Sequence, residues 1–193
     1  MCLTPAFLHE TLCRLAKWRV GEKLKELTPY FSPKDNLLDV GSGNCVLCYE
    51  LRNRGYTVTA LDVDNLSFIN SIKPVIYDGV EMPFEDACFD VALVITVLHH
   101  TQNPERVLME AKRVARRILV IEEIYSTTFD KYVTYFIDSV FNFEFFNHPH
   151  TNKTDTGWRD VFKRLGLKLV HVQYTRSILV LKRVTYVLEK ETL

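Results

Sequence analysis

The stretch that decides the fold is Leu37-Leu38-Asp39-Val40-Gly41-Ser42-Gly43-Asn44-Cys45, in which an apolar run leads into a short turn with two glycines. Residues 36–40 are predicted as a buried strand, and a helix is expected to follow the turn and to stop at Gly55. Glycines let the backbone of such a turn approach a ligand closely, and the free N–H groups at the start of the helix attract an anion. The stretch therefore predicts a turn that holds a carboxylate or a phosphate.

Acidic residues follow at the ends of the next two predicted strands. Asp62 comes at the end of residues 57–63, where a carboxylate can accept hydrogen bonds from two ribose hydroxyls. Asp78 and Gly79 come at the end of residues 74–78. A glycine turn alone is shared by dinucleotide enzymes and by plain tight turns, so these acids favour a nucleotide-type ligand. Asp90, at the start of a strand, is interpreted as structural.

Strands alternate with helices through the middle of the chain. Residues 89–98 form a near-continuous apolar run, which is typical of a parallel strand buried on both faces. Asn103-Pro104-Glu105 is a helix start, and we predict a helix over 104–116 and a strand over 118–122. This alternation predicts an α/β, doubly wound, mostly parallel sheet that binds its ligand at the carboxyl ends of the strands.

The two flanks differ from this core. A helix is expected over 6–27, before the first strand. Nine of the 22 residues from 125 to 146 are aromatic, and the spacing of their first part predicts an amphipathic helix, so the fold class includes an aromatic helical inset. A short helix closed by Gly166 and an antiparallel C-terminal strand pair, 167–174 and 178–188, complete the prediction.

Length and composition bound the class of protein. The chain has 193 residues, of which 47% are hydrophobic, and this suits one folded domain. Lys plus Arg and Asp plus Glu are both 24, so the charge expected of a dedicated nucleic-acid binder is absent and nucleic acid is an unlikely partner. We see no membrane span and no leader segment, and expect a cytoplasmic protein. Five cysteines at irregular spacing favour reduced thiols over disulfides.

The ordered motifs DVGSGN, LDVD, YDGVEMPF and FDVALVITVLHH resemble those of class I S-adenosylmethionine-dependent methyltransferases, of the ubiquinone/menaquinone-biosynthesis type (methyltransferase type 11). The resemblance covers residues 36–123, and residues 158–169 are similar to a late helix and strand of that branch. It implies a Rossmann-like, seven-stranded sheet and S-adenosyl-L-methionine as cofactor, with S-adenosyl-L-homocysteine as product. It also implies a single methyltransferase domain over 1–193, made of a helical cap (1–30), a cofactor core (36–123), an aromatic lid or substrate inset (125–150) and a C-terminal helix and strand pair (154–190).

The resemblance assigns cofactor roles by position. Asp39, Gly41 and Gly43 would shape the pocket for the methionine part, Asp62 would hold the ribose hydroxyls, and Asp78 and Gly79 would meet the adenine. The full set of expected cofactor-binding residues is Asp39, Gly41, Ser42, Gly43, Asp62, Val63, Asp78, Gly79, Ile95 and Thr96. Two positions depart from the family pattern: Cys45 stands where a third small residue is usual, and Arg116-Arg117 replaces the usual Pro-Gly-Gly turn.

The reaction implied is methyl transfer to a small, apolar or aromatic acceptor by in-line displacement. A hydroxyl acceptor needs a base, for which His100, His148, His150 and Glu123 are the candidates in falling order of preference. No metal site is expected. Alternatives left open are an RNA or protein methyltransferase and a non-catalytic module that binds a cofactor or a partner. The aromatic inset is open between a lid, an interface and core packing, and the acceptor atom and oligomeric state are open too.

Overall fold

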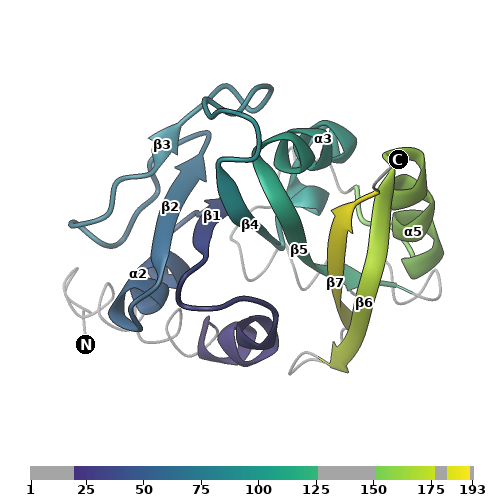
Figure 1. The fold of residues 1–193 in the computed structure, drawn as a ribbon, viewed down its shortest axis with the longest axis horizontal. Helices are drawn as coiled ribbons and strands as arrows, with labels where there is room; N and C mark the ends of the chain where they lie inside the picture. Colours follow the sequence, from purple (N-terminus) through teal and green to yellow (C-terminus); the bar gives the residue numbers. More distant parts are fainter. Residues whose placement is uncertain (1–19, 126–150, 177–181, 192–193) are drawn as a thin grey trace, which may run out of the picture.

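A seven-stranded sheet forms the centre of the molecule in the computed structural model, which describes residues 20–125, 151–176 and 182–191 (Figure 1). Its strands are β1 (Asn36–Val40), β2 (Thr57–Asp62), β3 (Val75–Ile76), β4 (Phe89–Ile95), β5 (Ala115–Ile124), β6 (Leu167–Arg176) and β7 (Lys182–Lys190). They lie in the order β3-β2-β1-β4-β5-β7-β6. The sheet is parallel from β3 to β5, and β7 pairs antiparallel with both β5 and β6.

The predicted fold class is thereby confirmed, including the antiparallel strand pair. The central strands β1 and β4 are buried along nearly their whole length, as expected for apolar strands covered on both faces. The aromatic helical inset lies outside the described residues from position 126 on, as do residues 6–19 of the helix predicted over 6–27.

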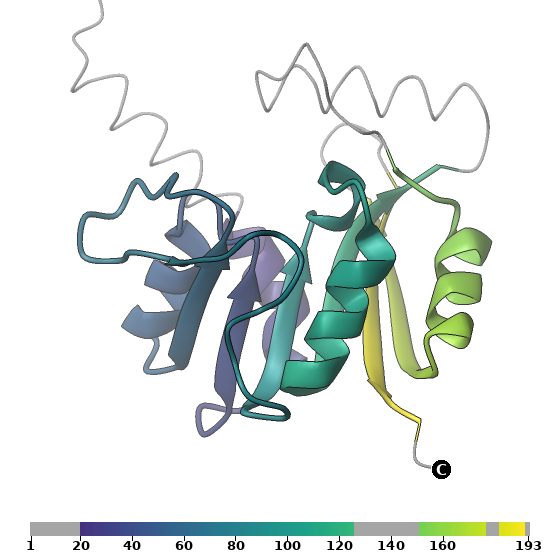
Figure 2. The same cartoon turned by 90° about the horizontal axis from the view of Figure 1, so that it is seen from above.

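Helices cover both faces of the sheet. Residues 20–27 are helical and continue into η1 (Thr28–Tyr30); the others are α2 (Val46–Asn53), η2 (Leu98–His100), α3 (Pro104–Val114) and α5 (Asp155–Arg164). Seen from above, α3 and α5 lie on one face, and α2 and the helical residues 20–27 lie on the other (Figure 2). Side-chain caps start two of them, since Asn103 accepts from the amide of Arg106 at 3.0 Å and Thr154 accepts from the amide of Gly157 at 3.1 Å.

Each face has its own apolar core. Trp158 and Phe162 of α5 pack on one side of the sheet against Tyr186 of β7. Leu24 and Leu51 pack on the other side, from the helical residues 20–27 and from α2. Burying one such side chain stabilises the fold by about 1.5–3 kcal/mol, so both helical layers are held by packing rather than by helix propensity.

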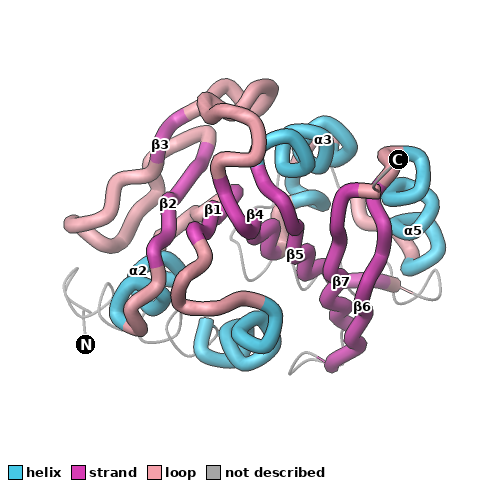
Figure 3. The backbone as a smooth tube through the Cα atoms, viewed as in Figure 1, coloured by secondary structure: helices cyan, strands magenta, loops and turns pink. Residues whose placement is uncertain are grey.

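The connections on one side of the sheet differ from the simple alternation. Neither 63–74, between β2 and β3, nor 77–88, between β3 and β4, contains a helix, and the tube in Figure 3 is loop throughout the second of these. β3 has only two residues, fewer than the predicted 74–78. β5 is longer than predicted, because it starts at Ala115 directly after α3 and takes in Arg116-Arg117 without a turn.

None of the helices in the described parts of the chain is long and apolar enough to cross a bilayer.

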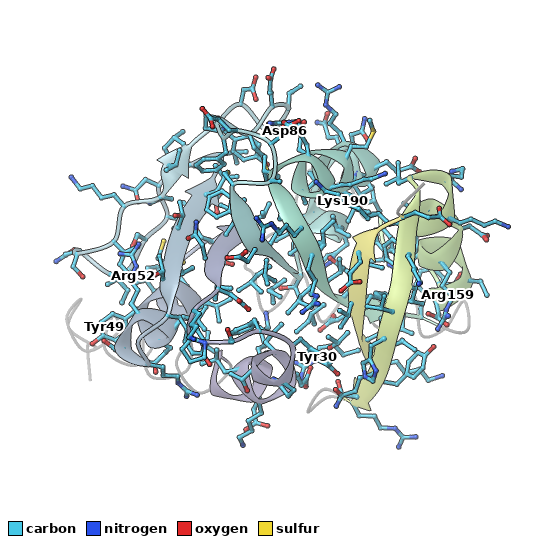
Figure 4. All side chains as sticks on the ribbon, viewed as in Figure 1. Tyr30, Tyr49, Arg52, Asp86, Arg159 and Lys190 are labelled. Atoms are coloured by element: carbon cyan, nitrogen blue, oxygen red, sulfur yellow. The ribbon has the colours of Figure 1, made fainter. Side chains whose placement is uncertain are left out.

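The N-terminal layer is tied to the far edge of the sheet, since Tyr30, labelled in Figure 4, donates from its hydroxyl to Gln173 of β6 at 3.0 Å. The parallel strands β1, β2 and β4 end at one edge of the sheet, and the predicted cofactor residues at or after these strand ends lie there.

Candidate functional site

The glycine turn after β1 is held against β2 and β4. The amides of Gly41 and Ser42 both donate to the carbonyl of Leu61, at 2.8 and 3.1 Å. Gly41 has φ +68°, and a Cβ placed on it would lie 2.6 Å from Cγ2 of Val97. At Gly43, with φ +49°, a Cβ would meet nothing within 4 Å. Gly41 thus allows a close approach of two segments, whereas Gly43 borders open space at the strand ends.

Cys45, which stands where the family pattern has a third small residue, adopts a backbone conformation that favours glycine. Its φ is +58°, in the left-handed region, and the next residue begins α2. The side chain is buried, and its thiol lies 3.5 Å from the hydroxyl of Ser42. A non-glycine residue in this conformation costs about 1–2 kcal/mol. The turn therefore has the shape of a glycine-rich loop despite the thiol.

Asp62 joins the turn to the end of β2. Its Oδ2 accepts from the amide of Gly43 and its Oδ1 accepts from the amide of Val63, both at 2.7 Å. A carboxylate has about four acceptor positions, so two backbone donors leave capacity for hydroxyl groups. Asp62, the predicted ribose-binding residue, is thus fixed in place by the backbone amides of the glycine turn and of Val63.

Asp39 lies beneath the turn rather than on its surface. Its side chain is buried, at 2% exposure, and Oδ2 accepts from the thiol of Cys48 at 3.1 Å. Burial raises the pKa of Asp39 to about 7, against the opposing effects of the Cys48 hydrogen bond and the Lys23 charge. The Asp39 side chain therefore ties the end of β1 to α2 and does not itself form an open surface of the site.

Asp78 and Gly79 follow β3 in an exposed loop. The amides of Val80 and Glu81 donate to Oδ1 of Asp78 at 2.8 and 3.0 Å, and these hydrogen bonds lower the pKa of the carboxyl. Gly79 has φ +78°, and Cγ1 of Val63 would lie 3.4 Å from a Cβ there. Val63 is 58% exposed, so an apolar surface lies open between the end of β2 and this loop. A flat ring could cover it.

The turn after β4 is strained. Thr96 has φ +56°, which is a genuine outlier for a β-branched residue. Its amide donates to Ile121 of β5 at 2.7 Å, and its hydroxyl donates to the carbonyl of Ile95 at 2.6 Å. Such strain costs about 1–3 kcal/mol and clusters where ligands are held. Ile95 and Thr96 thus stand at the edge beside the glycine turn.

A buried pair, Glu122 and His99, was missed by the sequence prediction, which named their neighbours Glu123 and His100. Glu122 is fully buried; its Oε1 accepts from the amides of Val97 and Leu98, at 3.1 and 2.8 Å, and its Oε2 lies 2.5 Å from Nδ1 of His99. A signal was present, because Glu122 directly follows the apolar residues 118–121, much as Asp62 follows Ala60 and Leu61. This carboxylate fixes the turn between β4 and η2.

The predicted bases lie around this pair only in part. The ring of His100 is half-buried, with its centroid 4.0 Å from that of His99. Glu123 is half-buried on β5, opposite Arg183 of β7 in the register. His148 and His150 lie outside the described residues. The chain returns at the same edge directly after them, since the amide of Thr151 donates to the carbonyl of His99 at 3.3 Å.

Asp90, interpreted as structural, makes structural contacts at the opposite edge. Its Oδ2 accepts from the amide of Asn36 at 2.9 Å, and its Oδ1 lies 3.4 Å from Arg116. Within the described parts of the chain no three His, Cys, Asp or Glu side chains are grouped so as to hold a metal ion.

The sheet order, the glycine turn after β1 and the acids after β2 and β3 define the class I S-adenosylmethionine-dependent methyltransferase fold. Residues 38–118 match the family model described as a methyltransferase domain, and S-adenosylmethionine is the cofactor of this class. The match begins one residue before Asp39 and ends within β5, so it contains every cofactor residue predicted from the sequence.

Two curated proteins and many solved structures are similar to this chain. An uncharacterized protein of Methanocaldococcus jannaschii, MJ1123, is 31% identical over 85 residues, which are 44% of this chain and 42% of the relative. The sterol 4-C-methyltransferase strm-1 of Caenorhabditis elegans is 28% identical over 134 residues, which are 58% of this chain and 40% of the relative. The matched part thus spans less than half of either relative. A methyltransferase of Archaeoglobus fulgidus, described as SAM-dependent, has the same fold, with a TM-score of 0.71 at 14% identity, covering 96% of this chain and all of that one (100%).

The residues present fit this cofactor. Open space at Gly43 allows the backbone to approach a ligand, and the anchored carboxylate of Asp62 suits a pair of hydroxyls. The exposed side chain of Val63 gives a flat aromatic ring an apolar surface to cover. These three features adjoin one another along the ends of β1 and β2.

Proposed function

We propose that this protein transfers a methyl group from S-adenosylmethionine to a small, apolar or aromatic acceptor by in-line displacement. The observation that carries the proposal is the hydrogen bond from the amide of Gly43 to Asp62, which locks the glycine turn to the acid at the end of β2. A plain tight turn does not need a buried acid to fix its second glycine. This bond holds the backbone of the glycine turn and the carboxylate of Asp62 together at one edge of the sheet.

In this proposal the cofactor lies across the ends of β1, β2 and β4. Gly41, Ser42 and Gly43 border its methionine part, above Asp39. Asp62 accepts from the ribose hydroxyls, and the adenine lies on Val63 beside Gly79. Asp78 shapes the adenine loop through its bonds to Val80 and Glu81, which use the oxygen Oδ1. Ile95 and Thr96 border the methyl group.

The cofactor supplies an activated methyl group on a sulfonium, which an acceptor atom displaces directly. The chain then has to align the acceptor and exclude water. The turn after β4 serves this purpose, because Glu122 holds its amides and Val97 packs against Gly41. For a hydroxyl acceptor we propose His100 as the base, with His148, His150 and Glu123 as the next candidates.

An apolar or aromatic acceptor is supported by the sequence that follows β5. Residues 125–146 hold nine aromatic residues, and they connect β5 to the segment that docks on η2 through Thr151. Both attachment points lie at the carboxyl edge. The Caenorhabditis relative is named as an enzyme that acts on a sterol, which is an apolar acceptor. A single methyltransferase domain over 1–193 and a cytoplasmic location stay predictions of the sequence.

Titration calorimetry tests the cofactor. Wild-type protein is titrated with S-adenosylmethionine, S-adenosylhomocysteine and NADH, and so are the variants Asp62→Ala and Asp64→Ala. Asp64 is a matched control, because it is exposed and its Oδ1 accepts only from the neighbouring amide of Asn65 among the bonds of this loop. Loss of charged hydrogen bonds predicts binding weaker by about 10- to 100-fold in Asp62→Ala. No binding by wild type, or a preference for NADH, contradicts the proposal.

The acceptor is then sought by incubating the protein with labelled S-adenosylmethionine and panels of phenols, quinones, sterols and polar metabolites. Transfer to apolar or aromatic compounds, lost in Asp62→Ala, is the expected result. Transfer only to polar metabolites contradicts the acceptor class. Cofactor binding without transfer to any acceptor, including RNA and protein, indicates a non-catalytic module.

A further inference from the structure

Lys23 lies on the inner face of the helical residues 20–27, outside the segment that matches the methyltransferase domain. Val20, Leu24 and Leu27, at positions i−3, i+1 and i+4 from Lys23, are buried on that face. Lys23 itself is half-buried, and its side chain reaches the sheet edge, where Nζ donates to Oγ1 of Thr96 at 3.1 Å. A cation from the N-terminal layer thus stands at the end of β4, beside the strained turn.

The same ammonium acts on the ends of β1 and β2. Its charge lowers the pKa of the buried Asp39, which the nearby Asp62 raises. Lys23 and Asp62 therefore both lie close enough to Asp39 for their charges to act on it. Asp62 suits the hydroxyls of an amino-acid nucleoside, but its negative charge repels the carboxylate of such a ligand. Among the groups whose charges act on Asp39, Lys23 is the positive one, and an ammonium attracts a carboxylate.

We infer that Lys23 binds the carboxylate of the methionine part of the cofactor. The inference rests on the proposed function. Thr96 orients the ammonium from the end of β4, and the open side of Gly43 leaves room for the amino-acid part beside it. The helical residues 20–27 are in this way part of the cofactor site, and residues 38–118 alone would lack the charge that holds this end of the ligand.

A structural role for Lys23 is the rival explanation. In this role the ammonium offsets the negative charge of Asp39 and ties the helical residues 20–27 to Thr96. The two roles differ in which part of the ligand they affect. S-Adenosylhomocysteine contains the amino-acid carboxylate, whereas 5′-methylthioadenosine contains the adenosine and the sulfur but no carboxylate. A structural defect weakens the binding of both ligands, and loss of a carboxylate contact weakens only the first.

Calorimetric titration of wild type, Lys23→Met and Lys23→Arg with these two ligands separates the roles. Lys25→Met is the matched control, because the side chain of Lys25 is 74% exposed and pairs with Glu22. We expect Lys23→Met to bind S-adenosylhomocysteine about 10- to 100-fold more weakly, as for a lost charged hydrogen bond, and methylthioadenosine within about twofold of wild type. Lys23→Arg should recover part of the affinity, and Lys25→Met should bind as wild type does.

Equal weakening for both ligands, or unchanged affinity of Lys23→Met for S-adenosylhomocysteine, overturns the inference while leaving the proposed function in place. If wild type binds neither ligand, the proposed function fails and the inference fails with it. Thermal unfolding of each variant without ligand is measured in parallel, so that a fold defect is recognised independently of binding.

Discussion

The contact between Gly41 and Val97 makes a quantitative prediction for Gly41→Ala. Both Gly41 and Gly43 have positive φ, so an alanine at either position costs about 1–2 kcal/mol of unfolding free energy from the backbone alone. At Gly41 the new Cβ would also lie 2.6 Å from Cγ2 and 2.9 Å from Cγ1 of Val97. Valine is stiff at χ1, so this overlap adds about 1–3 kcal/mol.

Gly41→Ala is therefore expected to lose about 2–5 kcal/mol, and Gly43→Ala about 1–2 kcal/mol. Urea unfolding followed by far-ultraviolet circular dichroism measures both. The double variant Gly41→Ala/Val97→Ala removes the overlap, so the cycle with the two single variants should show a favourable coupling of about 1–3 kcal/mol. Equal losses at the two glycines, or no coupling with Val97, would refute the close approach of the turn after β4 to the glycine turn.

Two further predictions concern buried acids. Glu122→Ala should destabilise the fold by about 3–5 kcal/mol, because it leaves His99 and two backbone amides without their shared acceptor, and an equal loss in Glu123→Ala would argue against this role. Burial raises the pKa of Asp39 from 3.8 to about 7, so the folded protein keeps a proton that the unfolded chain has lost in that window. Wild type should lose stability relative to Asp39→Asn as pH rises from about 4 to about 7, by at most about 1.4 kcal/mol per pH unit; a constant difference in urea midpoints would contradict the assignment.

Local sequence patterns predicted most of the elements of this fold. The apolar run at 89–98 and the capping group at Asn103 identified β4 and α3, because burial and capping act over a few neighbouring residues. The two-residue length of β3 was not predictable in this way. It depends on how long the chain stays beside β2, where only Leu61 and Asp62 have partners in the register.

The site divides along the same line. Gly41 and Asp62 were predicted as site residues because each stands at a fixed place at the end of a strand, and their role stays a prediction. The pairing of Glu122 with His99 was not, since it depends on β5 lying next to β4 and on the turn of the backbone at Val97 and Leu98. Lys23 was not predicted for a similar reason. The sequence around this lysine does not indicate that its side chain reaches Thr96 at the end of β4.

The position of β7 between β5 and β6 determines the order in which the sheet can be completed. β6 is synthesised before β7, yet among the strands of the described residues β7 is its only hydrogen-bonded neighbour. A chain that emerges from the ribosome at about 5–20 residues per second can therefore form the sheet of strands β1 to β5 before β6 has a partner strand. Until β7 arrives, β5 and β6 both carry unpaired strand edges, and an unpaired edge is where one nascent chain joins another. Correct assembly of this half of the sheet thus requires β7 to insert between β5 and β6 faster than the nascent chains aggregate.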